Sequence, residues 1–136
     1  MGVWGPGNFD GDSPRDFLAD MVSRWEKVID TVLSGEVPDE AARLEFKPGL
    51  DLGESCLIPT VEIISAVAEN LPCDYLPSPE KIVRWAEQYL GLYDSQIDGW
   101  DPSPGYKEKR RQVIAETFAG LFRLVESRSE GPGTSA

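Results

Sequence analysis

The chain has no histidine and only two cysteines among its 136 residues. Histidine is the usual proton shuttle at neutral pH and the commonest nitrogen ligand of protein metal sites. Its absence excludes serine and cysteine triads that depend on histidine. Cys56 and Cys73 cannot form any of the usual four-ligand zinc sites on their own. We expect them to act as small buried apolar residues, although a disulfide between them is compatible with the sequence.

Long apolar runs are also missing, and the N-terminus lacks the basic region and apolar core of a secretory signal. We therefore expect a cytoplasmic protein with reduced cysteines and no membrane partner. The length fits one domain, which buries roughly two thirds of its unfolded surface on folding. No cofactor is predicted.

Basic residues are scarce: 13 lysines and arginines face 24 acidic residues, which gives a net charge of -11. The deficit lies in the first 105 residues, whereas the remainder is mildly basic around Lys107 to Arg111. An acidic body repels phosphates, so we expect no nucleic acid partner and interpret the basic cluster as a solvated helix face. Such a body can attract a basic protein partner.

Apolar residues recur at helical spacing in four segments, and no segment alternates like a half-buried strand. We predict helices from Ser13 to Gly35, over residues 55–70, over residues 79–90 with Gly91 after them, and over residues 106–127. Residues 36–53 should be mostly irregular, and residues 92–105 should form a loop with one short helical turn. The predicted fold is an all-α, single-domain bundle of about four helices over residues 1–126, followed by a disordered tail over residues 127–136.

The helix ends and core faces follow from local chemistry. Ser13 is the expected N-cap with Pro14 at the first helical position, and Pro59 must lie in a first turn or bend an earlier-starting helix. The expected apolar stripes include Phe17, Ile63, Val83 and Val113.

The N-terminal loop MGVWGPGNFDGDSPRD is the most unusual segment, because glycines alternate with aromatic and acidic residues. Glycine permits tight turns, so we expect the loop to wind over the helices with Trp4 and Phe9 packed into them. The segment resembles the start of a family of small bacterial proteins, DUF4259, with the pattern M-G-x-W-G-x-G-x-F-D-x-D-x-x-x-D. The family name implies no activity, so the resemblance concerns organisation and leaves function open.

Three aspartates of this loop, Asp10, Asp12 and Asp16, are candidate ligands for a hard cation, because calcium loops begin with oxygen ligands at alternating positions. The calcium-loop pattern is nevertheless incomplete, since Pro14 and Met21 occupy two ligand positions. The alternative is that Asp12 and Asp16 satisfy amides at the start of the first helix while Asp10 stabilises a turn.

Glu62 and Trp100 complete the candidate binding residues, which also include Trp4 and Phe9. Glu62 lies between apolar neighbours, so we weigh a partly buried general acid or base against an ordinary ion pair or a solvated helix side. Trp100 lies in a loop, where it either caps the core or anchors a partner. The expected function is a non-enzymatic protein-binding module of the inhibitor or immunity type. The alternative is a metal- or small-ligand-binding protein, possibly hydrolytic, that uses the acidic loop.

Overall fold

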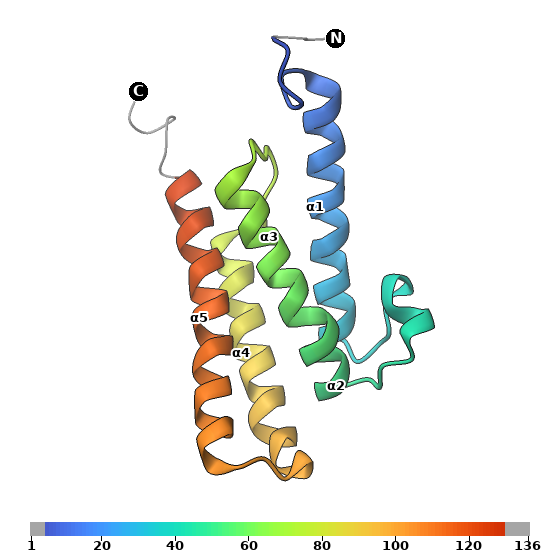
Figure 1. Cartoon of the computed structure of the whole chain (residues 1–136), viewed down its shortest axis with the longest axis vertical. Helices are drawn as coiled ribbons and strands as arrows, with labels where there is room; N and C mark the ends of the chain where they lie inside the picture. Colours follow the sequence, from blue (N-terminus) through green and yellow to red (C-terminus); the bar gives the residue numbers. More distant parts are fainter. Residues whose placement is uncertain (1–4, 130–136) are drawn as a thin grey trace.

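The computed structural model describes residues 5–129, which form helices joined by short turns (Figure 1). The long helices are α1 (Asp12–Leu33), α3 (Ile58–Asn70), α4 (Pro79–Gln96) and α5 (Pro104–Ser129). Shorter elements occupy the connections: η1 (Asp39–Leu44), α2 (Leu50–Leu52), η2 (Gly53–Leu57) and η3 (Ile97–Trp100). This described part of the chain has no strand, so the predicted all-α bundle of about four helices is confirmed.

The long helices form a four-cornered bundle in which neighbours in sequence run antiparallel (Figure 1). α5 packs against both α3 and α4, and α1 packs against the same two helices from the opposite corner. α1 and α5 therefore occupy opposite corners, and α3 and α4 lie between them. Between residues 5 and 129, no helix is both long and apolar enough to cross a membrane.

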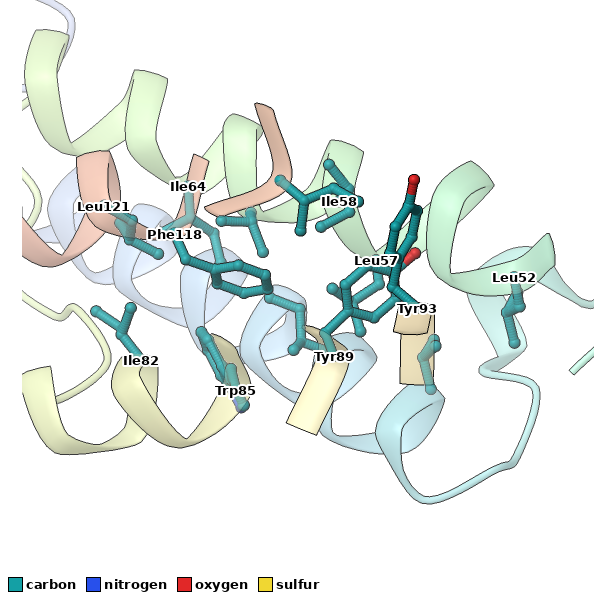
Figure 2. Close-up of a cluster of buried hydrophobic side chains, with 14 of the residues drawn as sticks. Leu52, Leu57, Ile58, Ile64, Ile82, Trp85, Tyr89, Tyr93, Phe118 and Leu121 are labelled. Atoms are coloured by element: carbon teal, nitrogen blue, oxygen red, sulfur yellow. The ribbon is translucent and has the colours of Figure 1, made fainter. Parts of the chain in front are cut away.

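The core is built from branched aliphatic side chains around a row of large aromatic residues (Figure 2). α4 contributes Trp85, Tyr89 and Tyr93, which are all at most 1% exposed. The ring of Tyr89 meets that of Phe118 from α5 at 6.3 Å between centroids, with the planes tilted by 48°. Aromatic pairs prefer such tilted arrangements over a face-to-face stack. This row joins α4 to α5 along the middle of the bundle.

Four predicted core positions are wrong, because each side chain is exposed. Each lies one residue away from a buried neighbour, as Phe17 does beside Leu18 and Val83 beside Ile82. One residue along a helix turns the side chain by roughly 100°, which is enough to leave a narrow apolar face. The corrected positions are Phe17 at 67% exposure, Val113 at 47%, and Ile63 and Val83 at 45% each.

The start of α1 differs from its prediction, whereas its end agrees. The helix begins at Asp12 with Gly11 as the N-cap, so Ser13 lies inside the first turn and does not cap it. Gly35 has a φ of +89°, the left-handed conformation that terminates many helices.

The second helical segment begins five residues earlier than predicted, at Leu50, and widens into the π-helical turn η2 before Pro59. The amide of Ile58 there donates to the Gly53 carbonyl, five residues back. In a regular helix the proline ring would clash with the carbonyl four residues before it. The wider turn relieves this clash and lets the chain continue into α3 without a break.

α4 does not end before Gly91 but continues to Gln96, because a glycine in an exposed helical position costs only about 1 kcal/mol relative to alanine. Buried Tyr93 and Ile97 beyond it continue the packing. α5 extends to Ser129, so residues 127–129 of the predicted tail are helical. The rest of that tail lies outside the described residues.

Candidate functional site

The N-terminal loop uses Asp10 to hold a turn. The amide of Gly7 donates to Asp10 Oδ2 at 2.8 Å, and the amide of Asp10 donates to the Gly7 carbonyl at 3.1 Å. Phe9 is half-buried against the core, as predicted. Trp4 lies outside the described residues, so its packing against the helices stays a prediction. Met1 and Gly2 of the pattern also lie outside them, and the resemblance to DUF4259 stays a prediction too.

The three aspartates do not come together as a cation site in the described residues. Asp12 and Asp16 are exposed in the first two turns of α1, whereas Asp10 is committed to its turn. Throughout residues 5–129, no three acidic or cysteine side chains are placed to hold a metal ion. The turn at Asp10 agrees with the alternative prediction for this residue, whereas a role of Asp12 and Asp16 at the helix start stays a prediction.

Glu62 is exposed, which agrees with the solvated helix side and not with the partly buried general acid or base. Its side chain does not meet α1, where Asp12 and Asp16 lie, but lines a groove of about 430 Å³ between α3 and α5. Glu69 lies two turns further along α3 in the same groove, and Glu116 faces them from α5. The groove therefore collects three carboxylates from two helices.

No cation within residues 5–129 forms an ion pair with these three glutamates. Glu116 only accepts a hydrogen bond from Gln112 Nε2 at 3.1 Å, on its own helix. Gly120 leaves the groove open, because an added Cβ there would meet nothing within 4 Å. Arg123 also lines the groove, so its net charge is -2.

Ser65 lies on the floor of this groove between the two α3 glutamates. Its hydroxyl oxygen is buried and has no hydrogen-bond partner in the described residues. Buried polar atoms in native proteins are nearly always hydrogen-bonded, and an unsatisfied one costs about 1–3 kcal/mol. The groove thus combines an unsatisfied hydroxyl with unpaired carboxylates.

Two acidic residues that sequence reasoning missed lie in polar networks: Glu26 is buried, and Glu54 is partly buried. Glu26 of α1 is 8% exposed and accepts hydrogen bonds from the Tyr75 hydroxyl and, at 2.7 Å, from Lys81 Nζ. Lys81 also donates to Asp30 at 2.7 Å, and the Trp85 indole donates to the other Asp30 oxygen at 2.8 Å. This cluster, the α1–α4 network, ties α4 and the preceding loop to α1.

The electrostatics of the α1–α4 network follow from its hydrogen bonds. The bond to Glu26 is the main cause that raises the pKa of Tyr75 to about 12, and burial adds to it. Burial alone would lower the pKa of Lys81, but its bonds to Asp30 and Glu26 outweigh that effect and raise it. Lys81 therefore stays charged and offsets one of the two negative charges.

The second of these acids is Glu54, on the π-helical turn η2. It accepts hydrogen bonds from the hydroxyl of Tyr89 and from Arg110 Nε, the latter at 2.7 Å. Burial and the bond to Glu54 raise the pKa of Tyr89 well above its usual range. Gly53 makes this contact possible, because a Cβ there would lie 2.3 Å from the Tyr89 ring. Widened turns of this kind are frequent at functional sites, but here the group serves packing between η2, α4 and α5.

The basic cluster predicted at the start of α5 is largely neutralised. Arg111 forms two hydrogen bonds of 2.8 Å with Asp94, and Lys107 donates to Asp98 at 2.6 Å. Arg110 pairs with Glu54, so Lys109 is the one member without an ion pair in the described chain. These contacts join the ends of α4 and α5.

Trp100 is 48% exposed in η3, so it does not cap the core, which was one of its two interpretations. Its exposed ring leaves the other interpretation, a contact for a partner, as a prediction. Cys56 and Cys73 are free thiols, and burial raises the pKa of both. Cys73 is buried, in agreement with an apolar role.

Comparison with known proteins adds no relative: no family model, curated protein or solved structure matches this chain. Among the candidate binding residues, the structure places Glu62 in a groove with Glu69, Ser65 and Glu116, which the sequence did not single out.

Proposed function

We propose that this protein is a non-enzymatic protein-binding module of the inhibitor or immunity type, whose groove between α3 and α5 binds basic side chains of a partner. One observation carries the proposal: three glutamates line one groove without an ion pair in the described chain, while the acids of the α1–α4 network are paired. Lysine or arginine entering the groove would supply the missing charge.

The surrounding field supports this binding mode. A chain with a net charge of -11 attracts cationic surfaces from a distance and repels phosphates. Complementary charges mainly accelerate encounter and select the partner, and this effect weakens with salt.

Two triple variants of equal charge test the proposal. Glu62→Gln, Glu69→Gln and Glu116→Gln remove the groove carboxylates. Control substitutions at exposed acids elsewhere, Glu36→Gln, Asp39→Asn and Glu80→Gln, change the net charge by the same amount. Each variant serves as bait in affinity capture from host lysate at low and high salt.

We expect wild type and the control variant to retain the same stoichiometric basic protein at low salt, and the groove variant to lose it. Binding should weaken about tenfold or more on raising the salt from 0.05 to about 0.5 M, because screening shortens the range of the attraction. Equal capture by both variants would show that overall charge, not the groove, is responsible. Capture that ignores salt would contradict the electrostatic mechanism.

A further inference from the structure

A second groove, on the other side of α5, has the opposite chemistry. It has a volume of about 300 Å³, lies between α4 and α5, and is lined almost entirely by apolar side chains. Three alanines, Ala86, Ala115 and Ala119, line it, and larger side chains flank them, including Val83, Leu90 and Phe122. Because an alanine side chain is a single methyl group, the alanines leave a hollow between the larger residues.

The dimensions of the hollow suit one kind of occupant. Val83 to Leu90 on α4 and Ala115 to Phe122 on α5 each span about two helical turns, roughly 10–12 Å. A groove of this length between antiparallel helices accepts the side chains that a third helix presents at positions i, i+3 or i+4, and i+7. Val83 at the rim is 45% exposed, so the apolar lining reaches the surface.

Charge decides which helix fits. Glu87 is the one charged residue that lines the groove, and it has no ion pair within residues 5–129. A second copy of this chain would add another net charge of -11. Charge complementarity therefore favours an occupant that carries positive charge beside its apolar stripe.

We propose that the α4–α5 groove binds an amphipathic helix of a partner protein whose apolar stripe is flanked by lysine or arginine. The apolar side chains fill the hollow over the three alanines, and a basic flank pairs with Glu87. This surface does not depend on the acidic α3–α5 groove, although both adjoin α5 and one partner could occupy both.

Two synthetic peptides test the proposal. Both are helical, about 18 residues long, with the same leucine stripe; one carries lysine and the other glutamate on either side of it. Each is titrated into ¹⁵N-labelled protein and followed by NMR. We expect the lysine peptide to bind at least about tenfold more tightly than the glutamate peptide. The largest shifts should fall on the amides of Ala86, Ala115 and Ala119.

Matched substitutions locate the site. Ala119→Gln fills the hollow with a polar side chain and should weaken binding about tenfold or more, whereas Ala66→Gln, at an exposed position of α3, should leave it unchanged. Binding should persist in the triple Gln variant of Glu62, Glu69 and Glu116, which separates this groove from the acidic one.

Four outcomes would overturn the proposal. The first is equal binding of both peptides, and the second is shifts confined to α3. The third is no binding of the lysine peptide at millimolar concentration. The last is a dimer in sedimentation that Ala119→Gln dissociates, which would assign the groove to a second copy of the chain. The first and the last leave the proposed role of the α3–α5 groove untouched.

Discussion

Where α1 meets α4, Glu26 and Asp30 are paired with Lys81, whereas in the groove between α3 and α5 Glu62 and Glu69 form no ion pair in the described chain. The first pair of acids is tied to a largely buried lysine, so the bundle depends on its charge balance. The second pair is exposed and contributes little to folding. Acids on opposite sides of one small bundle therefore have different roles: one set joins helices, and the other is available to a partner.

Removing the lysine of the α1–α4 network should cause the largest loss of stability. Lys81→Met keeps much of the aliphatic stem but leaves Glu26 and Asp30 without their cation, and breaking a buried pair costs about 3 kcal/mol. Chemical denaturation measures this loss. Lys27→Met, at an exposed position of α1, also removes one positive charge, and its free energy of unfolding should stay within about 0.5 kcal/mol of that of wild type. Equal losses in the two variants would show that the network adds no stability.

Gly53→Ala tests the close contact of η2 with Tyr89, the residue that donates to Glu54. The new methyl would lie 2.3 Å from a ring carbon of Tyr89, which is fully buried and cannot move aside. We expect a loss of about 2 kcal/mol from overpacking, measured by thermal or urea unfolding. Gly91→Ala, also helical but facing open space, should instead stabilise by about 0.5–1 kcal/mol. A stabilised Gly53→Ala variant would mean that η2 adjusts freely.

The hydroxyl of Tyr75 gives a smaller, pH-dependent effect. Tyr75→Phe removes its hydrogen bond to Glu26 and should cost about 1 kcal/mol at pH 7, since Tyr75 is partly exposed. Folding raises the pKa of this phenol from 10.0 to about 12 and so favours its neutral form. The contribution is complete below pH 10 and is lost as the pH rises through about 12.

Two measurements check this prediction. In an absorbance titration, the Tyr75→Phe variant should lack one phenol that ionises near pH 12. In urea unfolding, the stability difference between wild type and variant should shrink at alkaline pH. A difference that is constant from pH 7 to above pH 11 would rule out the coupling to Glu26.

The smallest change in stability is expected in the α3–α5 groove. Glu62→Gln should change the free energy of unfolding by less than about 0.5 kcal/mol, because the exposed carboxylate has no ion pair in the described chain to lose. The same substitution at Glu26, where Lys81 and Tyr75 depend on the charge, should cost several times more. Similar costs at the two positions would remove the distinction between structural and available acids.

Helical periodicity was enough to predict the bundle and the positions of its four long helices. Helix ends were harder, because they depend on packing that lies elsewhere in the chain. Gly91 looks like a stop, yet Tyr93 and Ile97 beyond it are buried and continue α4. Pro59 looks like a start, yet the wider turn at η2 accommodates it inside a longer helical segment.

The candidate site shows a similar limit. Glu62 has apolar neighbours on both sides in the sequence, but adjacent residues on a helix point to different faces. Glu26 carries the better signal for burial, because Val22, four residues before it, and Ile29, three after, are both buried. The grouping of Glu62 with Glu116 could not be read from either helix, since it depends on how α3 packs against α5.

The π-helical turn at η2 is equivalent to one extra residue inserted into a regular helix. Because the wide turn absorbs that residue, α2 and α3 keep the phase of one continuous helix on either side of it. Deleting one residue there would restore the ordinary ladder with little rotation of the buried leucines of α2, but it would narrow the turn that holds Glu54 against Tyr89 and Arg110. A one-residue deletion in this turn is therefore expected to change this local contact more than the packing of the bundle.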